Sequence, residues 1–402
     1  MTEKMRGVTL SAEWSPKPAF KLGHKDIDKK QTYLGSQVWR NPRIEIREYD
    51  VPQPGPGEVL IEVKACGICG SDVHMAQDDK DGYIYYPGLT GFPCILGHEL
   101  SGTVIEAGQG ALDKATNIPF KGGEKVCTEE MVWCGSCQPC ADGYPNHCER
   151  LDEIGFNING GFAKYIVLPA KLLWSIDPLK RMYKSEKEQF LAGSLIEPCS
   201  VAYNAVIQRG GGIKPGDNVV ICGGGPIGLA ACAILNKQGA ARVILSEPQE
   251  DRADMGRKMG ADYVINPQKV DFTQEVLRLT DGMGAKLYLE ATGLPTVVYP
   301  MIEKAIWEGR TLNSTIVVVA RADVKMPVTG EVLQVRRAQI VGAQGHSGEG
   351  TFPRVIQSIA SGMDVLPMIT KKIKLDEVPD NIVMLRTDRN ECKITCIMDE
   401  AL

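Results

Sequence analysis

The chain has 402 residues, of which 43% are hydrophobic and 24% are charged. This length suggests two large domains, and the composition is that of a folded globular protein rather than a disordered chain or a fibrous repeat. Fifty acidic residues against 45 basic residues leave a formal net charge of −5, whereas nucleic-acid binders usually carry a basic surplus. We therefore expect a small-molecule partner and no nucleic acid.

The sequence gives no sign of a membrane segment. The apolar stretch 219–235 has 17 residues, contains four glycines and a proline, and falls short of the ~20 residues that a bilayer requires. Residues 1–10 lack the apolar core of a signal peptide. We expect a cytoplasmic protein whose 13 cysteines are mostly thiols or metal ligands.

Two changes in residue composition and hydrophobic pattern along the chain predict its domains. Residues 1–200 are rich in glycine, proline, cysteine and β-branched residues, with alternating runs such as 59–64 that are typical of strands. Residues 201–344 alternate strand, glycine turn and helix, which predicts a doubly wound α/β domain. The expected strands are 218–222, 242–246, 286–290 and 315–320, and the expected helices are 226–238 and about 249–259. Residues 345–402 return to mixed texture and are expected to rejoin the first domain.

Four cysteines lie within fifteen residues in the spacing C-x2-C-x2-C-x7-C: Cys134, Cys137, Cys140 and Cys148. Four thiolates surround one tetrahedral Zn²⁺ with no open position, which is how structural zinc is held. A chance cluster of free thiols, a redox pair and an iron–sulfur cluster are the alternatives. We predict a structural zinc lobe over residues 127–150, and a closed site of this kind does not catalyse a reaction.

A second, open metal site is suggested by scattered ligand types. A catalytic zinc keeps three protein ligands and one free position. Cys69, His98 and one of Glu99 or Glu197 satisfy that requirement. On residue types alone this prediction is weak, because a single histidine or cysteine is more often a packed core residue.

The segment Gly223-Gly-Gly225-Pro226-Ile227-Gly228 fits the dinucleotide fingerprint G-x-G-x-x-G directly after an expected strand and at the start of an expected helix. Glu247 follows at the end of the next strand, where a carboxylate accepts hydrogen bonds from the adenine ribose and repels a 2′-phosphate. We therefore expect NAD rather than NADP. Arg252 lies nearby and could instead accept a phosphate, contact adenine or be a solvated helix charge.

Several motifs together resemble one family. CGICGSDVH (66–74), GHE (97–99), the four-cysteine lobe, GSLIEP (193–198) and GGGPIG (223–228) occur in this order in the zinc-dependent medium-chain dehydrogenases. The glutamates resemble the polyol and threonine dehydrogenase branch more than the ethanol-type branch. The segments 34–39, 86–92 and 341–348, with a long insertion at 13–40, resemble the scyllo-inosose (cyclitol) dehydrogenases.

The resemblance implies a GroES-like β-rich catalytic domain and a Rossmann domain with a doubly wound parallel sheet. It implies two zinc ions per chain, NAD as cofactor, a homodimer or homotetramer, and oxidation of a secondary alcohol on a ring polyol such as an inositol derivative. A sorbitol-type or threonine-type enzyme is the alternative within the family. A non-catalytic zinc-binding module is the alternative outside it, and the dinucleotide fingerprint weighs against that.

Roles carried over by matching position are as follows. Cys69 and His98 are expected to bind the catalytic zinc, with Glu99 and Glu197 as carboxylates that trade places or bind through water. Asp72 is expected to orient His98. Ser71 is expected to take the proton of the reacting hydroxyl and His74 to pass it outward. Polar side chains of 77–90, among them Asp78, Asp79, Tyr83, Tyr85 and Tyr86, are candidates for substrate contact, although surface loops are polar in any case.

Overall fold

The structure is a computed structural model that describes residues 3–24, 26, 30, 32, 34–322, 324–388 and 390–398. The chain forms two compact units, unit 1 from residues 1–197 and 369–402 and unit 2 from residues 198–368. Within the described residues, no single helix is long and apolar enough to span a bilayer, and one bent pair, Glu186–Ser194 with Ile196–Arg209, passes that test only when taken together.

Unit 1 is built on a seven-stranded sheet with the order β12-β8-β5-β3-β20-β19, in which β11 also pairs with β3. Its strands are β3 (Glu58–Gly67), β5 (Glu99–Ala107), β8 (Lys125–Thr128), β11 (Tyr165–Pro169), β12 (Leu173–Ser175), β19 (Ile369–Ile373) and β20 (Lys393–Ile397). Val59, Ile61 and Val63 of β3 are fully buried, as the alternating pattern of that segment predicts. Strands from both ends of the chain therefore share one core.

A long hairpin lies beside this sheet. It consists of β1 (Lys4–Trp14) and β2 (Trp39–Asp50), which pair antiparallel, while β4 (Cys94–Ile95) pairs with β1. The loop between them, 15–38, carries most of the insertion expected at 13–40, and residues 25, 27–29, 31 and 33 of it lie outside the described part of the chain. The short helix η1 (Gly35–Gln37) ends this loop.

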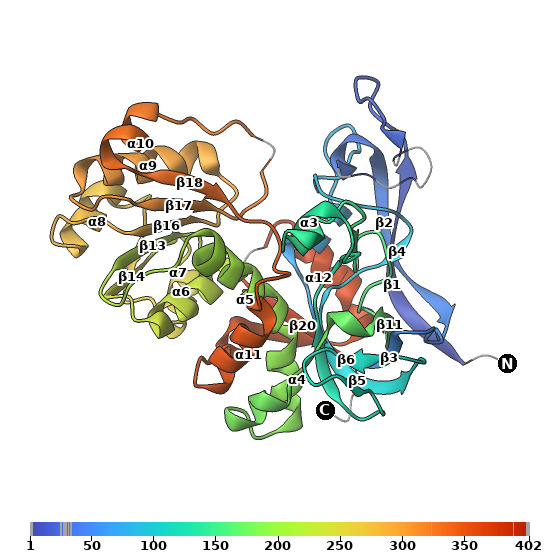
Figure 1. Ribbon diagram of the computed structural model, residues 1–402. Coiled ribbons are helices and arrows are strands. Elements are labelled where there is room, and N and C mark those ends of the chain that lie inside the picture. Colours follow the sequence, from blue (N-terminus) through green and yellow to red (C-terminus); the bar gives the residue numbers. More distant parts are fainter. Residues whose placement is uncertain are drawn as a thin grey trace. The chain divides into compact units, whose positions relative to one another are not determined.

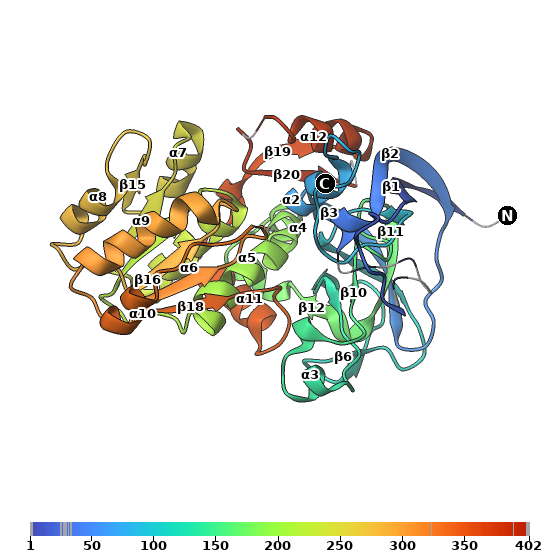
Figure 2. The ribbon, with the colours of Figure 1, turned by 90° about the horizontal axis from the view of Figure 1, so that it is seen from above.

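The remaining elements of unit 1 are short. The helices are α2 (Gly70–Ala76), α3 (Gln138–Ala141), α4 (Glu186–Ser194), the start of α5 (Ile196–Tyr203), α12 (Val378–Met384), η2 (Pro145–His147), η3 (Ala170–Leu172), η4 (Asp177–Arg181) and η7 (Leu375–Glu377). The further strands are β6 (Leu112–Asp113), β7 (Ile118–Pro119), β9 (Met131–Val132) and β10 (Asp152–Glu153). The C-terminal elements β20 and α12 pack against β3 and α2, respectively (Figure 2).

Unit 2 contains a six-stranded parallel sheet with the order β15-β14-β13-β16-β17-β18 (Figure 1). Its strands are β13 (Asn218–Cys222), β14 (Arg242–Ser246), β15 (Tyr263–Ile265), β16 (Leu287–Glu290), β17 (Thr315–Val318) and β18 (Gln339–Gly342). The chain order reverses between β13 and β16, which is the switch point at which such sheets bind ligands.

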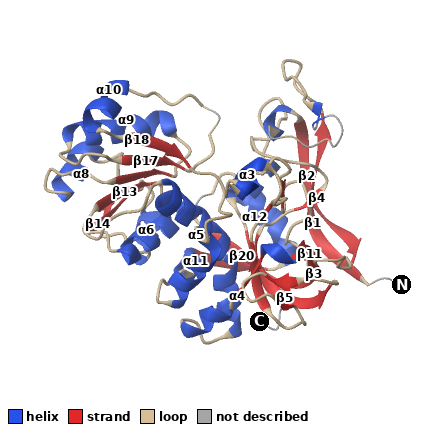
Figure 3. Cartoon of the chain, viewed as in Figure 1, coloured by secondary structure: helices blue, strands red, loops and turns tan. Residues whose placement is uncertain are grey.

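Helices cover both faces of this sheet (Figure 3). They are α6 (Pro226–Gln238), α7 (Glu250–Lys258), α8 (Phe272–Leu279), α9 (Pro295–Glu308), α10 (Gly330–Arg336) and α11 (Thr351–Ala360), with the π-helix η5 (Asn204–Arg209) and η6 (Leu366–Met368). Proline stands at the first turn of α6, and Gly239 ends that helix with φ of +93°, a conformation that favours glycine. The predicted doubly wound domain is confirmed, with β13, β14 and α6 at the expected residues.

The second domain boundary differs from the one expected. Residues 345–368, which we expected to return with the tail, belong to unit 2. Lys237 of α6 donates a hydrogen bond to the Ser361 carbonyl at 2.8 Å, and α7 contacts η6. Helix α11 buries Phe352 and Val355, so the chain leaves this unit only at β19.

Candidate functional site

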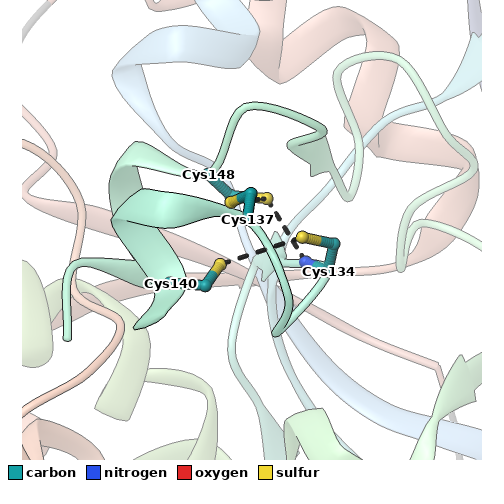
Figure 4. Close-up of side chains that lie close together, drawn as sticks. All are labelled: Cys134, Cys137, Cys140 and Cys148. Carbon is teal, nitrogen blue, oxygen red and sulfur yellow. Dashed lines mark hydrogen bonds between the residues drawn. The ribbon is translucent and has the colours of Figure 1, made fainter. Parts of the chain in front are cut away.

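The four clustered cysteines turn their sulfur atoms toward one another (Figure 4). All four sulfurs lie within 4.8 Å of one another, with Cys137 and Cys148 at 3.7 Å and Cys134 and Cys140 at 4.0 Å. A tetrahedral zinc with Zn–S bonds of about 2.3 Å holds its sulfurs about 3.8 Å apart. The donor set and its spacing therefore fit a closed zinc site.

Backbone amides and one arginine stabilise the thiolates of this lobe. Ser136 donates its amide to Cys134 Sγ at 3.4 Å, and Arg150 donates its guanidinium to the same sulfur at 3.3 Å. These donors lower the pKa of Cys134 to about 5. The amide of Arg150 also donates to Cys148 Sγ at 3.3 Å. Hydrogen bonds of this kind orient metal ligands and favour their charged form.

The second ligand group is assembled by strand pairing. Cys69 follows the end of β3 and caps α2, while His98 immediately precedes β5. Strands β3 and β5 pair with Gly67 opposite Glu99, so the two segments end side by side. Ligand atoms of Cys69, His98 and Glu99 consequently lie within 4.8 Å of one another, and among the described residues this group does not include Glu197.

Asp72 lies where it can orient His98. Its Oδ2 accepts the Cys69 amide at 2.9 Å, and its Oδ1 lies 3.9 Å from Nδ1 of His98. Both side chains are buried. Burial lowers the pKa of His98, but the negative charges around it, including those of Cys69 and Asp72, outweigh burial and raise that pKa well above its usual value. The negative charges thus give the group a negative electrostatic potential, which favours binding of a cation.

Glu99 has an oxygen without a partner at this centre. Its Oε1 accepts a hydrogen bond from Lys393 at 2.6 Å, while Oε2 is buried and has no hydrogen-bond partner among the described residues. An orphaned buried carboxylate oxygen beside a thiolate and an imidazole fits a divalent cation. The sulfur, nitrogen and oxygen donors match the set that catalytic zinc prefers.

Glu197 lies at the start of α5 and acts on this centre through its charge, which raises the pKa of both His98 and Glu99. Its carboxylate oxygen lies within 4.8 Å of that of Glu130. The choice between Glu99 and Glu197 as third ligand stays a prediction. Glu130 and Lys393 were missed by sequence reasoning, because only strand pairing and chain folding bring them here.

Ser71 and His74 occupy one side of α2, three residues apart. Ser71 Oγ lies 3.5 Å from Nε2 of His98 and is partly buried, whereas His74 is exposed. The pair thus runs from the ligand group to the surface of unit 1, as a proton path requires.

The polar segment 77–90 has mixed roles. Asp79 accepts the amides of Asp81 and Tyr83 at 2.8 and 2.9 Å, so its carboxylate shapes the turn itself. Lys17 of the insertion and Arg40 of β2 lie over the Tyr83 ring in cation–π contacts. Tyr83 therefore packs against these two residues.

An aromatic pair connects this segment to the ligand group. The buried Tyr86 ring lies 5.2 Å from that of Phe156, and the Phe156 ring lies 4.7 Å from that of His98. Tyr85 is half exposed and Asp78 forms a bridge with Ile84. Tyr86 is therefore the candidate of this stretch that ring contacts tie to the ligand group.

The fingerprint glycines of unit 2 adopt the geometry that a dinucleotide needs. Gly223 has φ of +105°, and a Cβ on Gly228 would lie 1.9 Å from the Gly223 carbonyl oxygen. A Cβ on Gly225, which caps α6, would meet nothing within 4 Å, so open space lies at that helix N-terminus. Pro226 and Ile227 form the first turn behind it. Such a turn fits a pyrophosphate.

Glu247, the residue after β14, contacts this turn. Its Oε2 accepts the Gly224 amide at 2.7 Å and its Oε1 accepts the Gln249 amide at 2.8 Å. The side chain is buried. Arg252 lies next to Gly224, because a Cβ added to Gly224 would be 3.3 Å from the Cβ of Arg252. Glu247, which was expected to bind the adenine ribose, and Arg252, whose role was left open, thus both lie beside the fingerprint.

Comparisons with known proteins agree with this geometry. Residues 55–178 match the alcohol dehydrogenase GroES-like domain, and residues 226–361 match the zinc-binding dehydrogenase domain. The chain is 59% identical over 396 residues to scyllo-inosose 3-dehydrogenase of Thermotoga maritima, covering 98% of this chain and 100% of that one.

The chain belongs to the zinc-binding alcohol dehydrogenase family. A solved structure of a putative alcohol dehydrogenase from Thermotoga maritima superposes with a TM-score of 0.94 at 59% identity, covering 98% of this chain and 100% of that one. L-threonine 3-dehydrogenase of Pyrococcus horikoshii is 32% identical over 348 residues, covering 86% of this chain and 92% of that one. This zinc-binding alcohol dehydrogenase is thus an oxidoreductase of CH–OH groups that uses zinc and a nicotinamide dinucleotide, and its GroES-like and Rossmann domains are confirmed.

Removing Cys140 tests the structural lobe of this dehydrogenase. Because metal binding there is part of folding, we expect Cys140→Ala to lose one zinc per chain and about 3 kcal/mol, lowering Tm by roughly 6–12 °C. Differential scanning fluorimetry with elemental analysis measures both quantities. Cys232→Ala removes a buried thiol of unit 2 that belongs to no ligand group among the described residues and serves as control. An unchanged Tm and zinc content in Cys140→Ala would show that the lobe holds no structural metal.

Proposed function

We propose that this chain is an NAD-dependent zinc dehydrogenase that oxidises a secondary alcohol of a ring polyol, scyllo-inosose or a related inositol derivative. The observation that carries the proposal is 59% identity, over 98% of this chain and 100% of the relative, to a scyllo-inosose 3-dehydrogenase. The grouped Cys69, His98 and Glu99 support the metal requirement. We also propose two zinc ions per chain, because two ligand groups are present.

The residues divide the reaction between them. When bound, zinc supplies a Lewis acid for the alcohol oxygen and the nicotinamide supplies the hydride acceptor. Cys69 and His98 would hold the metal together with Glu99 or Glu197, and Asp72 would fix the His98 ring. Ser71 would accept the hydroxyl proton while passing its own outward, and His74 would deliver a proton to solvent. The carbon-bound hydrogen would be transferred as hydride to the nicotinamide, leaving a ketone.

Glu247 supports a preference for NAD. Its buried carboxylate is fixed by two amides beside the fingerprint turn. A 2′-phosphate placed next to this charge would be repelled, whereas ribose hydroxyls can donate to its remaining lone pairs. Arg252 is half-buried at the same turn. Its positive charge favours a 2′-phosphate and therefore opposes the effect of Glu247 on cofactor preference.

A threonine-type enzyme is the second candidate. The 32% identity to an L-threonine 3-dehydrogenase over 86% of this chain favours it, and the ligand motifs serve either substrate class. A sorbitol-type enzyme is the third.

We further propose a cytoplasmic homodimer or homotetramer. The structure describes all 13 cysteines and joins none of them in a disulfide, which suits a reducing compartment. Among the described strands β18 pairs only with β17 and forms an edge of the sheet, and unit 2 exposes Trp307, Leu312 and Val335. Light scattering coupled to size-exclusion chromatography should give two or four chains per particle, and a single chain would contradict the proposal.

A substrate panel tests the proposed activity. With NAD, inositol-type rings and their keto derivatives should exceed ethanol by about three decades in kcat/KM, because polar groups left unpaired in a polyol site penalise a substrate that lacks the hydroxyls. NADH absorbance measures the rate with each cyclitol, sorbitol, threonine and ethanol. If threonine were the best substrate, the cyclitol proposal would be wrong and the chain would be a threonine-type dehydrogenase.

Glu247→Ala tests the cofactor preference. Removing the carboxylate should weaken NAD and relieve repulsion toward NADP, so that the ratio of the two kcat/KM values shifts by about 10- to 100-fold, or about 1.4–2.8 kcal/mol. Steady-state kinetics with both cofactors gives the ratio. A ratio that stays constant would mean that Glu247 does not contact the ribose.

Gly35→Ala tests how the insertion supports the substrate side. The Gly35 amide donates to the Gly88 carbonyl at 3.2 Å, and a Cβ on Gly35 would lie 2.4 Å from Thr90 Oγ1. The substitution should push the 77–90 segment and Tyr86 away and lower cyclitol kcat/KM by about tenfold or more, with the Kd of NAD unchanged.

Gly330→Ala is the matched control, since a Cβ there would meet nothing within 4 Å. Kinetics and NAD titration separate the two effects. Equal loss of NAD binding and cyclitol turnover in Gly35→Ala would mean that the insertion supports the fold as a whole rather than the substrate side.

A further inference from the structure

One lysine of unit 1 is buried against the catalytic ligand group. Lys393, on β20, has a side chain that is 1% exposed, and its Nζ lies 2.6 Å from Oε1 of Glu99. The same ammonium donates to the Ile68 carbonyl at 3.0 Å. Burial lowers the pKa of Lys393, but the negative charges of Glu99 and Cys69 together with the hydrogen bond to Glu99 outweigh burial and raise that pKa above its usual value. A buried charge is tolerated only when it is paired in this way.

The strand register explains how a residue from the C-terminal segment reaches this place. Strand β20 pairs antiparallel with β3, with Thr395 opposite Gly67, and the Ile68 amide donates to the Ile394 carbonyl at 2.8 Å. Lys393 therefore lies two residues beyond the partner of Gly67, the last residue of β3. Its ammonium binds the chain just before Cys69 and also the residue just after His98. It thus joins the two segments that supply all three ligands.

Glu99 is held with one oxygen engaged and one oxygen left over. Oε1 is taken by Lys393, while Oε2 is buried without a hydrogen-bond partner among the described residues. Gly67 makes room for that second oxygen, because a Cβ on Gly67 would lie 2.2 Å from Oε2. A side chain at position 67 would displace it. The carboxylate is therefore presented to a cation through a single oxygen.

Lys393 supplies a positive charge at a centre that has an excess of negative charge. The Cys69 thiolate and the carboxylates of Asp72, Glu99 and Glu197 are four negative charges when ionised, against the two positive charges of zinc. The buried ammonium offsets part of that excess. Removing it leaves Glu99 free to turn both oxygens toward the metal and leaves an unbalanced charge in a desolvated place.

We propose that Lys393 is the positioning residue of the catalytic metal, which restricts Glu99 to one ligating oxygen and thereby limits how tightly the ion is held. This inference rests on the proposed catalytic zinc group and deepens it. Lys393 itself touches neither the alcohol nor the nicotinamide in the proposed reaction, so its effect is on the metal and only through it on turnover.

Metal release and the cobalt spectrum test this role without an activity assay. In Lys393→Met a positive charge beside the metal is gone and Glu99 can offer both oxygens, so release of the catalytic zinc to a chelator should slow by about 10- to 100-fold. In the Co²⁺-substituted protein the visible d–d bands should weaken as a second Glu99 oxygen raises the coordination number. Release from the four-cysteine lobe should stay unchanged, which shows that the fold is intact.

Two further variants keep the test sharp. Lys371→Met is the control, because Lys371 lies on the neighbouring strand β19 and its ammonium binds the amide oxygen of Asn381 at 2.8 Å. It should match the unmodified protein in both measurements. If Lys393→Met does not fold, Lys393→Gln replaces it, since an amide can still donate to the Ile68 carbonyl while the charge is gone.

The outcomes separate this inference from the proposed function. Unchanged zinc release and unchanged cobalt bands in the Lys393 variant, with two metals bound per chain, would overturn the role of Lys393 alone. Binding of cobalt by the four-cysteine lobe and nowhere else in the unmodified protein would overturn the catalytic metal group itself, and the inference with it.

Discussion

The antiparallel pairing of β3 with β5 on one side and with β20 on the other is the constraint on which the catalytic centre depends. Gly67 lies opposite Glu99 in one pair and opposite Thr395 in the other. A shift of either register by one residue would turn every side chain of the shifted strand to the other face. The register that buries the core of unit 1 is therefore also the register that collects thiolate, imidazole, carboxylate and ammonium at one point.

The two metal groups are built by different physical means. The four-cysteine lobe is local, since its ligands come from one short segment and its thiolates are stabilised by amides of the same segment. The catalytic group is non-local, and its negative charges are held together in the core by Lys393 from the far end of the chain. The local group requires only that its own segment is folded, whereas the non-local group requires the strands of unit 1 to be paired.

This difference explains what the sequence could predict. The strands and helix around the fingerprint, 218–222, 226–238 and 242–246, follow from hydrophobic pattern and glycine placement, and they lie where they were expected. The four cysteines are recognisable by spacing alone. Lys393 gives no local signal, because its burial beside the ligand group follows from the pairing of β20 with β3. Glu130 gives none either, because only chain folding brings its carboxylate to that of Glu197. The boundary at 345 was wrong for the same reason, since α11 is held in unit 2 by contacts with α6 that are distant in sequence.

The most direct test of the account is a metal count per chain in the unmodified protein and in His98→Ala, made on protein never exposed to a chelator. The account predicts two zinc ions in the first and one in the second, with the same Tm to within a few degrees, because the four-cysteine lobe keeps its metal. A single zinc in the unmodified protein, or two retained in His98→Ala, would contradict the claim that strand register assembles a catalytic zinc site around His98.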